Sequence, residues 1–228
     1  MPRKKSKKSV LPQLMAVAFM LGTLFGVTLA AIWVQGLPVL TLSSGDNYSR
    51  SMTIVGVEKS TGQGKLATVT VGFRSGSGRL LVEVPPYENE DTQQAAIDAR
   101  AAASLYTGKS LSAVDIVVSV ENIEATTTIA GPSASSAMAV LMVAVINAAD
   151  NKTPNLVDQT AVVSASIDST GRLNPIGGAS EKYSAVAVAG GYSKFIVSDG
   201  QPDATQTSSS LSVQYALNLQ ELAGLVLS

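Results

Sequence analysis

Residues 129–149 read IAGPSASSAMAVLMVAVINAA, and the rest of the chain must fold around them. From residue 137 to 149 the side chains are apolar around almost the whole helical circumference, which predicts a buried helix rather than an amphipathic surface helix. Small polar residues before a helix usually cap it, and Ser135 or Ser136 fits that role. Ser133, in a Gly-Pro-Ser turn, is then left without a structural assignment.

The remaining pattern mixes strands and helices without strict β-α-β alternation, so the predicted fold class is α+β. About 190 residues follow the N-terminal segment, enough for one domain with a sizeable core. Strands are predicted at 51–58, 66–73, 79–84, 114–120, 125–129, 161–167, 194–198 and 211–214, and further helices at 91–106, 180–189 and 217–227.

The amino-acid composition excludes several types of catalytic and metal-binding site. The 228 residues include no histidine and no cysteine. A Ser-His-Asp triad, a thiol nucleophile, a disulfide and a zinc site of the usual ligands are therefore excluded. No clustered carboxylate motif is present, so neither a metal nor a cofactor is predicted.

Charge is concentrated at the N-terminus, where the first eight residues hold five of the sixteen basic side chains. The remainder carries eleven basic and seventeen acidic groups, a net charge of −6 that disfavours nucleic acid as a partner.

Residues 14–34 form an uncharged stretch of 21 residues, long enough to cross a bilayer. The basic cluster before it predicts a cytoplasmic N-terminus by the positive-inside rule. We therefore expect a basic cytoplasmic terminus at 1–13, a transmembrane anchor at 14–34, a linker at 35–50 and an extracytoplasmic domain at 51–228. A cleaved signal peptide is the alternative, and it leaves the domain on the same side.

Ser133 precedes a buried helix, where the N–H groups and the positive end of the helix dipole can stabilise a developing oxyanion. A serine hydroxyl becomes a good nucleophile only when a base removes its proton. Because histidine is absent, that base must be a carboxylate or a neutral lysine.

The lysine candidate lies in residues 175–191, PIGGASEKYSAVAVAGG. On a helix, Lys182 shares a face with Ala185, Val186 and Ala189, whereas Glu181 lies off that stripe. Burial there would lower the lysine pKa. The alternative is snorkelling, in which the stem is buried and the ammonium reaches water; the helix alone leaves both open.

The pair of motifs GPSAS and PIGGASEK resembles the proteolytic domain of the Lon family, and the similarity extends over most of residues 51–200. The resemblance implies that Ser133 is the nucleophile, that Lys182 is the base and that Ser164 orients the lysine amine. The stretch upstream of GPSAS is similar to standalone archaeal members, which carry an N-terminal membrane segment.

Taken together, these features predict a membrane-anchored serine endopeptidase that hydrolyses unfolded proteins or peptides without ATP, since the chain lacks the ATPase domain of many relatives. Backbone N–H groups at Ser133 and Ala134 are the candidate oxyanion hole. The resemblance also makes a homo-oligomer possible. An extended substrate is expected to pair by β-addition with Thr126, Thr127, Thr128 and Ile129.

The sequence departs from the family pattern at two places. Ala130 stands where many bacterial members have aspartate, and Ser164-Ala165-Ser166 replaces a segment that is often Thr-Gly-Glu. An inactive peptide-binding scaffold with the same fold is therefore an alternative. A Ser/Lys amidase is a second one.

Overall fold

The computed structural model describes residues 37–58, 60–83, 90–121, 132–202, 204 and 208–228. The compact unit spans Pro38–Ser228 and so begins before the predicted boundary at residue 51. Leu40 is buried in the core, and its N–H donates to the Ser110 carbonyl at 2.9 Å, so part of the predicted linker packs into the domain. The predicted terminus and anchor at 1–34 lie outside the described residues, as do Thr126–Ile129.

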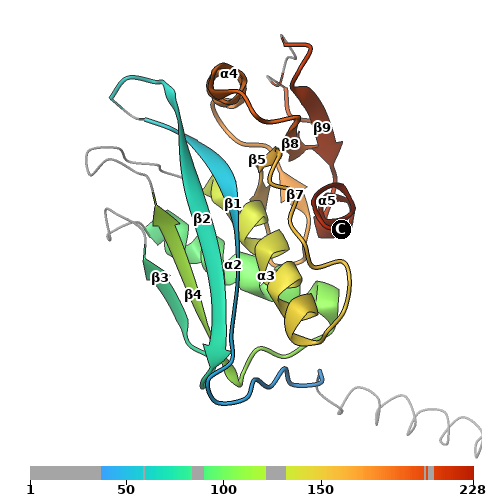
Figure 1. Cartoon of the computed structure of the whole chain (residues 1–228). Helices are drawn as coiled ribbons and strands as arrows, with labels where there is room; N and C mark the ends of the chain where they lie inside the picture. Colours follow the sequence, from blue (N-terminus) through green and yellow to red (C-terminus); the bar gives the residue numbers. More distant parts are fainter. Residues whose placement is uncertain (1–36, 59, 84–89, 122–131, 203, 205–207) are drawn as a thin grey trace, which may run out of the picture. The chain divides into compact units, whose positions relative to one another are not determined.

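The larger sheet has four strands in the order β1-β2-β4-β3 (Figure 1). The long hairpin of β1 (Asn47–Val57) and β2 (Gly64–Ser75) is antiparallel, and β2 also pairs antiparallel with β4 (Val114–Glu121). The short edge strand β3 (Leu80–Glu83) runs parallel to β4. Alternate side chains of β2 are buried, as expected for a sheet with one face on the core.

Two helices pack with this sheet: α2 (Glu90–Thr107) and α3 (Ser135–Ala149). A single 3₁₀ turn, η1 (Pro132–Ala134), precedes α3. Every side chain of α3 from Ser135 to Ile146 is buried, which confirms the prediction made from its uniformly apolar sequence.

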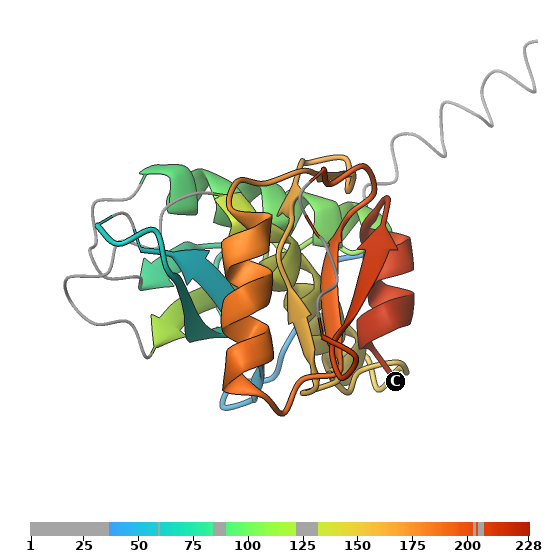
Figure 2. The same ribbon diagram turned by 90° about the horizontal axis from the view of Figure 1, so that it is seen from above.

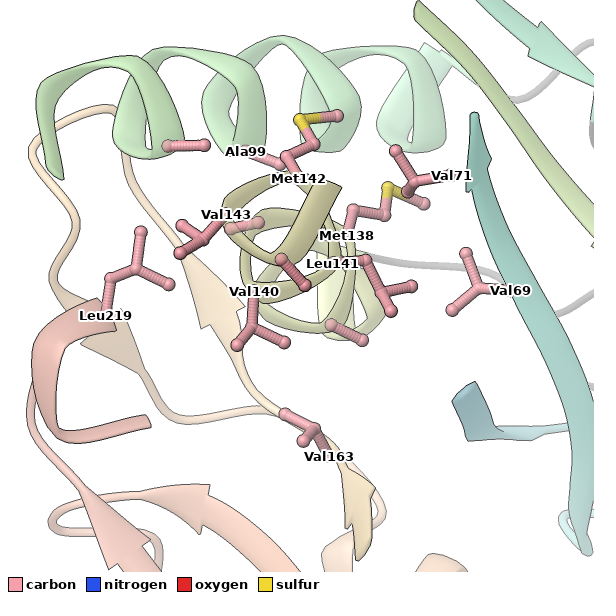
Figure 3. Close-up of a cluster of buried hydrophobic side chains, with 14 of the residues drawn as sticks. Val69, Val71, Ala99, Met138, Val140, Leu141, Met142, Val143, Val163 and Leu219 are labelled. Atoms are coloured by element: carbon pink, nitrogen blue, oxygen red, sulfur yellow. The ribbon is translucent and has the colours of Figure 1, made fainter. Parts of the chain in front are cut away.

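Helix α3 is buried because other elements surround it, and Figure 3 shows contributors from several of them. The labelled neighbours are Val69 and Val71 of β2, Ala99 of α2, Val163 of β5 and Leu219 of α5. A helix enclosed on all sides has no face exposed to water, and this explains why its sequence is apolar around the whole circumference.

A second sheet is parallel and has three strands in the order β5-β8-β9. Its strands are β5 (Ala161–Val163), β8 (Lys194–Ser198) and β9 (Ser212–Ala216). Helix α5 (Leu219–Val226) packs against α3. Helix α4 (Ala179–Ala189) contacts β1 and β2 and lies between that hairpin and the parallel sheet (Figure 2).

The predicted strand at 161–167 is wrong in one respect, because the structure divides it into two strands of different sheets. After β5 the chain turns at Ser164 and Ala165 and then forms β6 (Ser166–Ile167), which pairs with β7 (Leu173–Asn174). The Ala165 carbonyl accepts a hydrogen bond from the Ser136 hydroxyl of α3 at 2.6 Å. This carbonyl therefore does not extend the pairing of β5 with β8.

These elements confirm the α+β class, with several sheets and with helices that do not alternate regularly with strands. Among the described residues, Pro132–Ala149 is the one helical stretch long and apolar enough to span a membrane. It is the buried core helix α3 with its preceding turn, so its apolar composition is explained by its place in the domain.

Candidate active site

Ser133 lies in the middle of η1, immediately before α3, and is 6% exposed. The residue that caps α3 is Ala134, whose backbone is helical and which supplies no side-chain hydrogen bond. The prediction that Ser135 or Ser136 caps the helix is therefore wrong.

The two serines that follow have a tertiary role instead. The Ser135 hydroxyl accepts from the Ile167 N–H at 2.8 Å and donates to the Pro132 carbonyl at 2.6 Å. The Ser136 hydroxyl and N–H both donate to the Ala165 carbonyl. These bonds fix the segment after β5 against the amino end of α3, which also carries Ser133.

Ser164 precedes the residue that Ser136 binds and is completely buried. Its N–H donates to the Ile196 carbonyl at 2.9 Å, which continues the pairing of β5 with β8. Val162, two residues earlier in β5, belongs to the same buried cluster as Tyr183 of α4. No partner among the described residues satisfies the Ser164 hydroxyl.

Lys182 lies in the first helical turns of α4 and is 4% exposed. The buried face of the helix consists of Ala179, Lys182, Tyr183 and Val186. This face differs from the predicted one, because Ala189 is exposed at the helix end. The structure thus buries the side chain, one of the two alternatives that the sequence left open.

Tyr183 holds this face of α4 in place. Its hydroxyl donates to the Leu211 carbonyl at 2.9 Å and accepts from the Ser208 N–H at 3.0 Å. Its ring packs edge-on against Phe195 of β8, with 5.7 Å between ring centres. Sequence reasoning missed Tyr183, because the partners of its hydroxyl lie at least 25 residues away.

The electrostatics of Lys182 follow from its burial. No carboxylate among the described residues forms an ion pair with its ammonium, and no hydrogen bond to the ammonium is present there. Desolvation lowers the pKa of the Lys182 amine from 10.5 to about 8, against a smaller opposing effect of the Glu181 charge. A substantial fraction of the amine is therefore neutral at mildly alkaline pH.

Ser133 and Lys182 are not hydrogen-bonded to each other, although both are buried and both are among the described residues. Strand β1 contacts both η1, which carries Ser133, and α4, which carries Lys182. Ser135 and Ser136, which follow Ser133, thus bind the residues after Ser164, and Lys182 lies on α4, which contacts the β1–β2 hairpin.

The other predicted site residues divide into two groups. Ala134 is half-buried at the start of α3, where the N–H groups of the first turn point away from the helix. Thr126, Thr127, Thr128 and Ile129 lie outside the described residues, as does Ala130. Among the described residues no cluster of three or more potential metal ligands is present.

One further buried side chain near this site was not found from the sequence. Gln201 follows β8 and clamps Ile176 with two hydrogen bonds, each of 2.9 Å. The two residues are 25 positions apart, and nothing in the local pattern signals their pairing.

No protein-family model matches the chain, and no curated protein matches it. The resemblance to the Lon family therefore rests on the two motifs and their flanks.

Proposed function

We propose that this protein is a membrane-anchored, ATP-independent serine endopeptidase with a Ser133/Lys182 dyad and a Lon-like proteolytic domain. The observation that carries the proposal is Lys182, an almost completely buried lysine without a described counter-ion. Burying a cation without a partner is unfavourable for folding, so such a lysine is expected where its neutral form is used.

The chemistry follows from the groups present. Neutral Lys182 accepts the proton of the Ser133 hydroxyl while the serine oxygen attacks a peptide carbonyl and forms a C–O bond. The N–H groups at Ser133 and Ala134 stabilise the resulting oxyanion. The lysine then returns the proton to the leaving amine as the C–N bond breaks. Water, deprotonated by the same lysine, hydrolyses the acyl-enzyme and regenerates Ser133.

Ser164 supports this scheme because its hydroxyl is buried without a hydrogen-bond partner among the described residues, and because Val162, two residues earlier, belongs to the same buried cluster as Tyr183 of α4. We assign it to accept a hydrogen bond from the lysine amine during the reaction. Substrate binding must also bring the lysine amine to the serine hydroxyl, since the two are not bonded in the substrate-free structure. Catalytic hydrogen bonds commonly tighten only when substrate is bound.

The wider assignment rests on the sequence. The apolar stretch at 14–34 and the basic residues before it support a domain outside the cytoplasm that is anchored to the cell membrane. The proposed substrates are peptides and already unfolded segments. The reaction requires neither a metal nor an organic cofactor.

The test uses the full-length protein in detergent, with unfolded casein and without ATP. The variants are Ser133→Ala and Lys182→Ala, matched by Ser184→Ala and Lys152→Ala at exposed positions. Cleavage by the parent and the matched controls, but by neither dyad variant, supports the proposal.

Other results would point elsewhere. Cleavage by all five proteins would assign the activity to another site. An inert parent that still binds casein would favour a peptide-binding scaffold, and hydrolysis of small amides in preference to peptides would favour an amidase.

A further inference from the structure

Gln201 is a buried polar residue, 6% exposed, at the carboxyl end of the parallel sheet. Its own backbone is fixed there, because its N–H donates to the carbonyl of Ser198, the last residue of β8, at 3.2 Å. Its side-chain amide binds both backbone groups of Ile176: the amide oxygen accepts from the N–H, and the amide nitrogen donates to the carbonyl. Both bonds are 2.9 Å long.

Ile176 belongs to the turn that leads into α4. Two residues later Gly178 caps the helix with φ 68°, and its carbonyl accepts the hydrogen bond from the Lys182 N–H at 3.0 Å. A Cβ at Gly178 would lie 2.8 Å from Val57 Cγ2, so the turn also fits closely against β1. The position of the first turn of α4 is therefore set from both sides.

We propose that Gln201 is a positioning residue that holds the turn before α4 and thereby the site of Lys182. This inference rests on the proposed function of Lys182. The two hydrogen bonds join the turn to the loop that follows β8, and the backbone of this loop is itself bonded to Ser198 at the end of that strand. Among the described residues no other hydrogen bond joins this turn to the parallel sheet, so loss of the Gln201 bonds lets the first helical turn move. Displacements of about 1 Å at a catalytic group can reduce a rate about a hundredfold.

The test compares the full-length parent with Gln201→Met, which keeps the side-chain length and removes both hydrogen bonds. Gln159→Met is the matched control, because exposed Gln159 also donates to two backbone carbonyls, those of Ser51 and Val157. Thermal melts establish that each variant is folded, and kcat and KM are measured on a casein-derived peptide. Titration of ¹³Cε-labelled lysines by NMR follows the Lys182 amine, whose signal is identified by its absence in Lys182→Arg.

We expect Gln201→Met to lower kcat tenfold or more while KM changes by less than twofold. The Lys182 pKa rises by half a pH unit or more, because a loosened helical turn admits water to the amine. Gln159→Met leaves all three quantities unchanged. Unaltered kcat and an unaltered Lys182 titration in folded Gln201→Met would overturn the inference. This result would not contradict the proposed Ser133/Lys182 dyad.

If the parent does not cleave peptides, the proposed function fails, and the NMR titration still decides whether Gln201 controls the environment of Lys182. If Gln201→Met does not fold, Gln201→Glu takes its place, since it keeps the acceptor for the Ile176 N–H. A folded Gln201→Glu with the parent's kcat and the parent's Lys182 titration would also overturn the inference.

Discussion

Burial of Lys182 has a consequence for stability that does not depend on the function of the protein. Below pH 8 the amine is charged in both the folded and the unfolded state, so folding moves a charged group from water into a largely buried position. The pKa is about 8 in the folded protein and 10.5 for an ordinary lysine. At about 1.4 kcal/mol per pKa unit, this difference corresponds to about 3 kcal/mol of lost stability at pH 7.

Lys182→Met replaces the amine by an apolar side chain of similar length that suits the buried face of α4. We expect the free energy of unfolding to rise by up to about 3 kcal/mol at pH 7. Between pH 8 and 10.5 the unfolded parent binds more protons than the folded parent, so the parent gains stability as pH rises. The advantage of the variant therefore shrinks across this window and is small above it.

Urea unfolding of parent and variant at pH 7, 9 and 10.5 measures this difference. Lys152→Met, which loses an exposed lysine paired with Asp150, is expected to change stability by less than about 1 kcal/mol. Lys194→Met should destabilise the protein, because Lys194 has a counter-ion in Asp158 and donates to the Leu225 carbonyl. A Lys182→Met protein no more stable than the parent at pH 7 would refute the reasoning.

Further outcomes can be checked with the same assays. With Lys182 as the base, kcat/KM should rise with pH through about pH 8 and level off above it, because only the neutral amine accepts the serine proton; a flat profile between pH 6 and 9 would contradict this. Ser164→Ala should lower kcat about tenfold without lowering Tm, since it removes an unsatisfied buried hydroxyl, whereas Ser164→Thr should retain activity. Gly64→Ala should cost about 1–3 kcal/mol of stability, because its Cβ would lie 2.6 Å from Ala185 Cβ and from the Glu181 carbonyl oxygen; chemical denaturation measures the loss. Gly224→Ala, on the exposed side of α5 with open space around it, should instead stabilise the protein by about 0.5–1 kcal/mol, and a lower Tm would exclude that estimate.

Features that depend on local periodicity were predictable from the sequence. The uniformly apolar run of α3 indicated a buried helix, and the strands predicted at 51–58 and 66–73 lie largely within β1 and β2. The same pattern placed Lys182 on a mostly apolar helical stripe. It did not decide between burial and snorkelling, which depends on what packs against that stripe.

Tertiary contacts decided the rest. Ser135 and Ser136 bind the segment around Ala165 instead of capping α3, and that segment consequently turns away from β5.

Gln201 and Ile176 form a clamp across 25 residues, and Lys182 is enclosed because α4 packs between the β1–β2 hairpin and the parallel sheet. A sequence determines which residues are apolar and the period with which they recur. Which distant donor meets which acceptor, and which cation loses its water, are fixed only when the elements pack together.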